Sequence, residues 1–74
     1  MDADRLDLVR HLFALATEIA EDAHDVAVDG QNGSAAGAAE LRRAAERLQA
    51  EAGNLGDLAR AIAVITDRER NGGG

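Results

Sequence analysis

The residues of this chain that could do chemistry are mostly carboxylates, and they gather in its first third. Residues 1 to 29 hold eight acidic residues and two Arg, whereas residues 30 to 74 hold six of each sign. Four of these acids are spaced four, three and four residues apart, which places them along one face of a helix. We expect this acidic stripe either to contact a basic partner or to be solvated and partly neutralised by nearby Arg side chains; its members are Glu18, Asp22, Asp25 and Asp29.

The two His residues are candidate metal ligands. Glu21 and His24 are three residues apart and share a helix face, as the di-iron sites of helical bundles require, but the sequence has no second such pair. Glu18 and Glu21 resemble the magnesium-binding helices of small nucleotide pyrophosphohydrolases, whose companion acidic motif is absent here. His11 lies 13 residues before His24, too far along one helix to share an ion. We expect no metal site and no cofactor.

Nucleophilic and nucleic-acid chemistry have little support. There is no Cys; Ser34 suits a helix cap, and Thr17 and Thr66 lie within helical patterns. Arg42, Arg43 and Arg47 form the one compact basic group, but acidic residues flank it and no aromatic side chain lies near it for base stacking. We therefore expect a non-enzyme that does not bind nucleic acid directly.

Composition limits the elements that position these residues. The 74 residues make one small domain at most, half of the hydrophobic residues are Ala, and Phe13 is the only aromatic residue. So thin a core favours self-association, because chains of this size usually need a disulfide, a metal or a partner subunit. The net charge of −6 argues against an anionic membrane surface. With no apolar run of 18 residues and no signal peptide, we expect a cytoplasmic protein.

The sequence predicts an all-α hairpin. Proline is absent and Ala, Leu, Glu and Arg dominate, so summed propensity favours helix. Apolar residues recur every three or four positions from Val9 to Val26, which predicts a helix over about 4–28 with Asp2 or Asp4 as its N-cap. Glycines and Asn32 predict a turn at 30–33. A second helix follows over about 34–70, within a single domain of residues 1–70, and residues 71–74 form a disordered Gly-rich tail.

The second helix contains an unbroken heptad seam that continues to Thr66. Large and small residues alternate along it, which suits close antiparallel packing. This layering resembles that of the two-helix subunits that dimerise into four-helix bundles, such as the plasmid-copy regulator Rop, and covers no sequence motif. We expect the seam to form the oligomer interface through Leu41, Ala45, Leu48, Ala52, Leu55, Ala59 and Ile62.

Two glycines leave one alternative open. Gly53 and Gly56 would each cost about 1 kcal/mol inside a helix, and Asp57 could cap a third helix. The chain is then either a hairpin with a kink or break near 53–56 that pairs with a second copy, or a monomeric three-helix bundle.

The function expected from these features is protein–protein interaction. We predict a small helical regulator that acts as a homodimer and meets a basic protein through its acidic stripe. The alternative is an acidic inhibitor, similar in character to antitoxins and anti-CRISPR proteins, which would block a basic nucleic-acid-binding surface on a larger protein.

Overall fold

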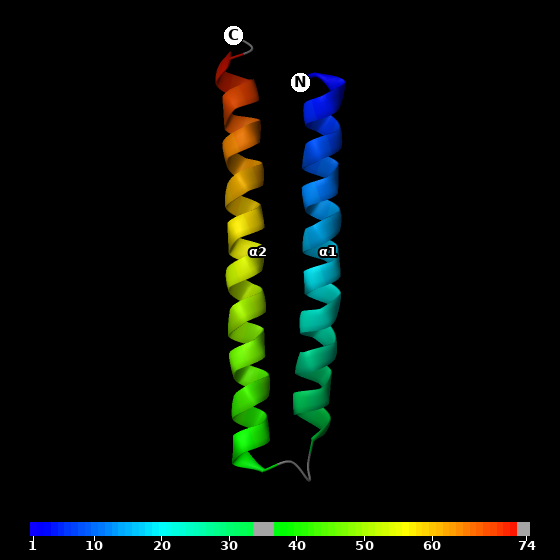
Figure 1. Cartoon of the computed structure of the whole chain (residues 1–74), viewed down its shortest axis with the longest axis vertical. Coiled ribbons are helices and arrows are strands. Elements are labelled where there is room, and N and C mark those ends of the chain that lie inside the picture. Colours follow the sequence, from blue (N-terminus) through cyan, green and yellow to red (C-terminus); the bar gives the residue numbers. More distant parts are fainter. Residues whose placement is uncertain (34–36, 73–74) are drawn as a thin grey trace.

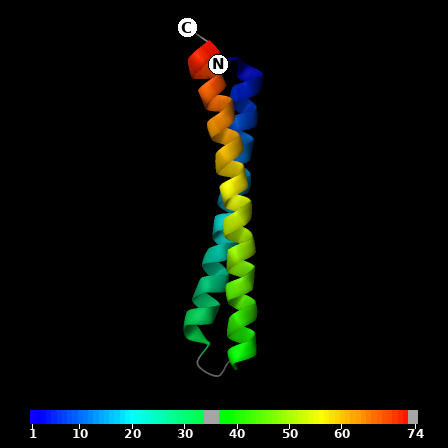
Figure 2. The same cartoon turned by 90° about the vertical axis from the view of Figure 1, so that its left-hand side faces the viewer.

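Two long antiparallel helices make up the described part of the chain. The computed structural model describes residues 1–33 and 37–72, with α1 at Ala3–Asn32 and α2 at Ala38–Gly72. The helices lie side by side with both termini at one end (Figure 1). Figure 2 shows that they cross at a small angle rather than running strictly parallel. The predicted all-helical hairpin is confirmed.

The N-terminus of α1 is capped as the sequence predicted. Asp2 is the N-cap, and its Oδ1 accepts a hydrogen bond of 2.8 Å from the backbone N–H of Arg5. Asp4 lies in the first turn, where the helix dipole favours negative charge. At the same end, the Arg5 guanidinium pairs with Glu69 of α2, which ties the two termini together.

The turn predicted at 30–33 is wrong in position. α1 continues through Asn32 and ends at a C-cap on Gly33, while α2 begins at Ala38. No proline blocks the extra turn and Gly30 has no positive φ, so the helix continues through it at the cost of about 1 kcal/mol that a helical glycine carries. Residue 37 is not helical, so α2 starts later than the predicted boundary of about 34, and the cap predicted at Ser34 lies outside the described residues.

The second pair of glycines does not interrupt α2. Gly53 and Gly56 are helical, so the chain does not break near 53–56 and the three-helix alternative is not supported, while the alternative of a kink there stays a prediction. Leu48, before the glycines, and Leu58, after them, both turn toward α1, and this shared packing face favours helix over turn. α2 also includes Asn71 and Gly72, which were predicted to belong to the tail; residues 73–74 lie outside the described residues.

Substituting these glycines tests the continuity of α2. A Cβ added at Gly53 or Gly56 meets no atom within 4 Å, and neither glycine has a positive φ. We expect Gly53→Ala and Gly56→Ala each to raise the free energy of unfolding by about 0.5–1 kcal/mol, because alanine favours helix. Urea denaturation followed by circular dichroism measures this. A loss of stability in both variants would contradict a continuous helix.

The core between the helices is a single narrow seam. Val9 on α1 and Ile62 on α2 are the two buried apolar residues of the described range, at 7% and 9% exposure. Half-buried residues continue the seam in both directions at heptad spacing. On α1 they include Leu12, Ala16, Ile19, Ala23 and Val26, and on α2 Ala44, Leu48, Leu55, Leu58 and Ile65.

Candidate interaction surfaces

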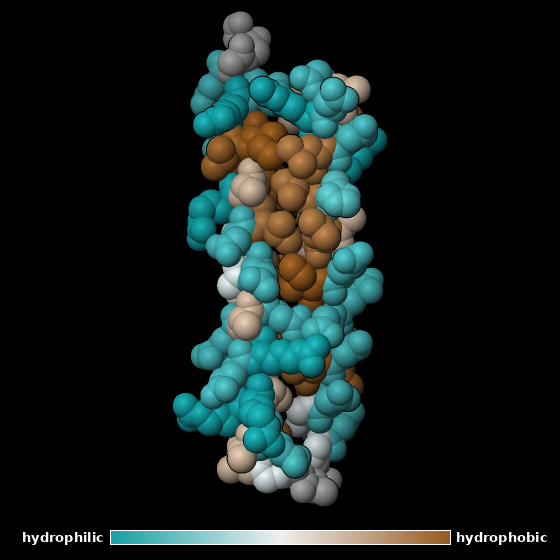
Figure 3. All heavy atoms as spheres, viewed as in Figure 1, coloured by the Kyte–Doolittle hydropathy of each residue, from teal (hydrophilic) through white to brown (hydrophobic). Residues whose placement is uncertain are grey.

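One face of the hairpin carries an open apolar groove. Figure 3 shows hydrophobic side chains gathered over both helices in the half nearest the termini, and polar side chains over the half nearest the connection. Three neighbouring hollows make up this groove: Asp57 lines the first and second, and Ile65 lines the second and third. Leu8, at 47% exposure, and Val64, at 48%, line it and remain open to solvent. The apolar lining residues of the groove are Leu8, Leu15, Ile19, Leu58, Ala61, Val64 and Ile65.

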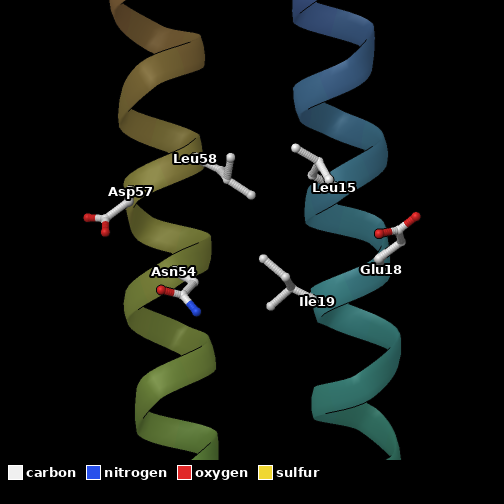
Figure 4. Close-up of a pocket in the computed structure, with 6 residues that line it drawn as sticks. All are labelled: Leu15, Glu18, Ile19, Asn54, Asp57 and Leu58. Atoms are coloured by element: carbon white, nitrogen blue, oxygen red, sulfur yellow. The ribbon is translucent and has the colours of Figure 1, made fainter.

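The lower part of the groove is bounded by carboxylates. In Figure 4, Leu15 of α1 and Leu58 of α2 point toward one another across the hairpin. Glu18 and Asp57 lie on the outer sides of the two helices and point away from this pair. Asp57 also pairs with Arg60 one turn further along α2, at 3.2 Å. The groove therefore presents an apolar floor with charged edges.

Nearer the connection, the same face becomes polar. Glu18 and Asp29 lie on one side of α1, because eleven residues make about three whole turns. Asp29 shares a hollow with Val26 of α1 and with Arg43 and Arg47 of α2. This end of the face thus sets an acidic edge of α1 beside a basic edge of α2.

The four residues of the acidic stripe differ in their surroundings. Asp22 is turned toward α2, where Nη2 of Arg47 donates to both of its carboxylate oxygens at 2.9 and 2.8 Å. Asp25 is 79% exposed and lies 3.7 Å from Nδ1 of His24. Glu18 lines the apolar groove and Asp29 the hollow near the connection. Part of the stripe is therefore neutralised within the chain and the rest is open to solvent.

A carboxylate interrupts the apolar seam of α2. Glu51 is 9% exposed and occupies the seam position between Leu48 and Leu55. Its Oε1 is buried with no hydrogen-bond partner in the described chain and lies 3.4 Å from Nε of Arg47. Together with Asp22, these residues form a cluster of two acids and one Arg, which we call the polar cluster. Its burial disfavours the charged form of Glu51.

The pKa values of the two acids of the polar cluster shift in opposite directions. Burial raises the pKa of the Glu51 carboxyl above its ordinary value, and the neighbouring Asp22 raises it further. A hydrogen bond with Glu51 lowers the pKa of Asp22, and the Arg47 guanidinium lowers it again. On protonation, Glu51 becomes the donor that Asp22 accepts from.

The residues of the predicted oligomer seam fall into two groups on α2, one packed against α1 and one exposed to solvent. Leu48, Leu55 and Ile62 are half-buried or buried against α1 of the same chain. The alanines that alternate with them in the prediction are exposed, as is Leu41; these are Ala45, Ala52 and Ala59. The seam positions that alternate with the large residues instead are Ala44, Glu51, Leu58 and Ile65. The oligomer interface stays a prediction, since the structure contains one chain.

Sequence reasoning missed Glu51, Leu58 and Ile65 as members of this seam. The register containing Leu58 and Ile65 buries more apolar surface than the register containing Ala59 and Thr66, and side-chain size was the available signal. That register also places Glu51 in the seam. Because an acidic residue is rarely buried, the sequence did not indicate it.

The groups considered for catalysis lie apart. Glu21 and His24 are exposed, as is His11, and in the described ranges no three His, Asp or Glu side chains gather where they could hold a metal ion. The hydroxyl of Thr17 donates to the Phe13 carbonyl at 3.0 Å, and that of Thr66 to the Ile62 carbonyl at 2.9 Å. These local bonds are typical of Thr inside helices.

In residues 1–33 and 37–72, neither helix combines the length and the apolar character needed to cross a membrane.

Comparison with known proteins found no family model, no curated protein and no solved structure that matches this chain.

Proposed function

We propose that this chain is a small non-catalytic interaction module that acts as a homo-oligomer. The observation that carries the proposal is the imbalance between its core and its surface. Only two apolar residues are buried in the described range, whereas seven large ones are at least 36% exposed, among them Phe13, Leu8 and Val64. Two helices with so narrow a contact do not bury enough apolar surface to offset the entropy of ordering them. A second subunit supplies the missing cover.

Contiguity of the exposed apolar side chains supports the same proposal. Single exposed apolar residues are ordinary, but three of these seven, Leu8, Leu15 and Val64, line the same groove on one face of the hairpin. The groove is bordered by charged residues, which is the arrangement of an interface with an apolar centre and a polar rim.

Dilution tests this function. We expect light scattering to give the mass of a dimer at high concentration, and circular dichroism of the same samples to show helix being lost as the dimer dissociates. Folding and association are then one equilibrium, as in obligate dimers. A monomer that keeps full helicity at every concentration would contradict the proposal.

The acidic inhibitor remains a second candidate, because charge is concentrated on α1. Residues 1 to 29 hold eight acids and two Arg, and Glu21 and Asp25 are exposed to solvent. The partner in this case is a basic protein rather than a second copy. Binding to such a protein, lost steeply as salt rises, would favour this candidate over a purely self-associating module.

A further inference from the structure

The face that carries the apolar groove also carries charges arranged for a second copy of the same chain. At the termini end it is apolar, and at the connection end α1 contributes Asp29 while α2 contributes Arg43 and Arg47. Asp25 lies on the same side of α1 as Asp29, one turn earlier. A partner that covers the whole face must therefore offer apolar surface at one end and both signs of charge at the other.

Residues at the same height along the hairpin define what a second copy can offer. Because the helices are antiparallel, Leu15 lies opposite Leu58, and Asp22 lies opposite Arg47. Asp29 and Arg43 line one hollow and so lie at nearly equal height. A two-fold axis parallel to the helices keeps every residue at its height while placing α1 against α2 of the other copy.

Net charge distinguishes this arrangement from the other two-fold arrangement. With the axis perpendicular to the helices, α1 lies against the partner's α1, and the two strongly acidic helices repel each other. With the axis parallel to the helices, each acidic α1 lies against an α2 that is neutral overall and has Arg43 on its near edge. Like charges directly across an interface are unfavourable, so the second arrangement is preferred.

We propose that a second copy covers the groove face about a two-fold axis parallel to the helices, with Asp29 beside the partner's Arg43. This inference rests on the proposed self-association and adds its geometry and its charged contacts. The apolar grooves of the two copies meet at the termini end. The open edge of the acidic stripe then serves self-recognition, and its basic partner is α2 of the second copy.

The size of the face suits this assembly. A standard interface buries about 800 Å² per partner, which is roughly a seventh of the 5513 Å² that the free hairpin exposes. The described helices give a molecule 57 Å long and 16 Å across, so one long face offers an area of this order. Covering it encloses Leu8, Leu15 and Val64, which the single chain leaves open.

Charge reversal with mixing tests the proposal. We expect Asp29→Arg and Arg43→Glu each to weaken dimerisation about tenfold, since symmetry turns two attractive contacts into two repulsive ones. An equimolar mixture should regain the affinity, because both contacts of the mixed dimer join opposite charges. The hollow within each chain still holds two like charges, so recovery on mixing reports only the contact between chains. Sedimentation across a dilution series gives the dissociation constants.

Matched controls carry the same charge changes away from the face. Glu21→Arg and Arg10→Glu alter the net charge equally, on exposed positions of α1 that line none of the hollows of the groove face. They should leave the dissociation constant within about twofold of the parent chain. Equal weakening by these controls, or no recovery on mixing, would overturn the charged contact.

The direction of the axis has its own measurement. The chain has no Cys, so a single Asn71→Cys carries one spin label near the end of α2. The proposed axis places the two labels at the same end of the dimer, at a separation well below the 57 Å length of the hairpin. A separation close to that length would overturn the geometry while leaving self-association intact. A parent chain that stays monomeric would instead contradict the proposed function itself.

Discussion

Ile62→Asp is expected to unfold the chain. Ile62 is one of the two buried apolar residues of the described range, so the variant loses packing and places a carboxylate against α1. Truncating a buried Ile costs about 2–5 kcal/mol, and burying an unpaired charge adds to that cost. This exceeds what so thin a core provides. Circular dichroism should show most of the helical signal lost at concentrations where the parent chain is folded.

The matched control for this variant is its neighbour. Ala63→Asp introduces the same charge one residue later, at an exposed position. It should change the midpoint of urea denaturation only slightly, because its carboxylate stays in water. If both variants unfolded alike, helix propensity or net charge would explain the loss rather than the seam. If Ile62→Asp kept full helicity, the assignment of Ile62 to the core would be wrong.

The fold could be predicted from periodicity because helix formation here depends on residues throughout each segment. The three- and four-residue recurrence from Val9 to Val26, and the seam through Leu48, Leu55 and Ile62, establish two amphipathic helices. The turn could not be located as well, because Gly30 and Gly33 both allow one. In the structure Gly30 is helical and Gly33 is the C-cap, and local propensity alone does not decide between the two glycines.

At Gly53 and Gly56 of α2, turn composition and helical periodicity again predict different structures. Turn composition at 53–56 suggested a break, whereas the heptad register preserved across it suggested one helix. In the structure the helix prevails, since the large residues of that register on both sides of the glycines, Leu48, Leu55 and Ile62, all turn toward α1. A helix already nucleated on both sides tolerates a glycine at about 1 kcal/mol, which is less than the cost of giving up the contacts beyond it.

The candidate surfaces were harder to predict because they depend on the register between the helices. The spacing of Glu18, Asp22, Asp25 and Asp29 places them along one side of a helix, but spacing alone does not say which one an Arg will meet. Arg47 reaches Asp22 and leaves Asp25 open. The apolar groove likewise needs Leu15 of one helix and Leu58 of the other at equal height, a relation set only by the antiparallel pairing.

Glu51→Leu is expected to stabilise the hairpin. Glu51 is buried in the seam with Oε1 lacking a hydrogen-bond partner in the described chain, so its carboxylate loses hydration without full compensation. Leucine fills the same position with apolar surface and continues the run from Leu48 to Leu55. Replacing buried ionic groups with apolar residues is often stabilising. We expect the thermal midpoint to rise by about 5 °C at pH 7, measured by circular dichroism.

The matched control is Glu46→Leu. Glu46 is an exposed acid of the same helix that pairs only with Arg42, at 3.1 Å, in the described chain. The control removes the same charge and adds the same side chain in solvent, so its thermal midpoint should stay close to that of the parent. A midpoint for Glu51→Leu at or below that of this control would mean that the polar cluster stabilises the hairpin as a unit.

The pH dependence of the stability of Glu51→Gln distinguishes the cost of burying the Glu51 charge from the effect of changing the shape of the side chain. The pKa of Glu51 is raised in the folded chain, so its contribution to stability is fully present below its ordinary value of 4.5 and is lost as pH rises through the raised value. Glutamine stays neutral and keeps the shape, so Glu51→Gln should be more stable than the parent at pH 7. That advantage should shrink as the pH falls and the parent's Glu51 becomes protonated.

Asp22 determines how the stability of the hairpin changes at still lower pH. Its pKa is lowered by Glu51 and Arg47, so its contribution is present above its ordinary value of 3.8 and is lost as pH falls through the lowered value. The parent chain should therefore gain stability from the polar cluster on mild acidification and lose it on stronger acidification. Urea midpoints of the parent and Glu51→Gln across this range measure both steps. Parallel curves for the two proteins would mean that Glu51 titrates as it does in water, and would remove the electrostatic reason for expecting Glu51→Leu to stabilise.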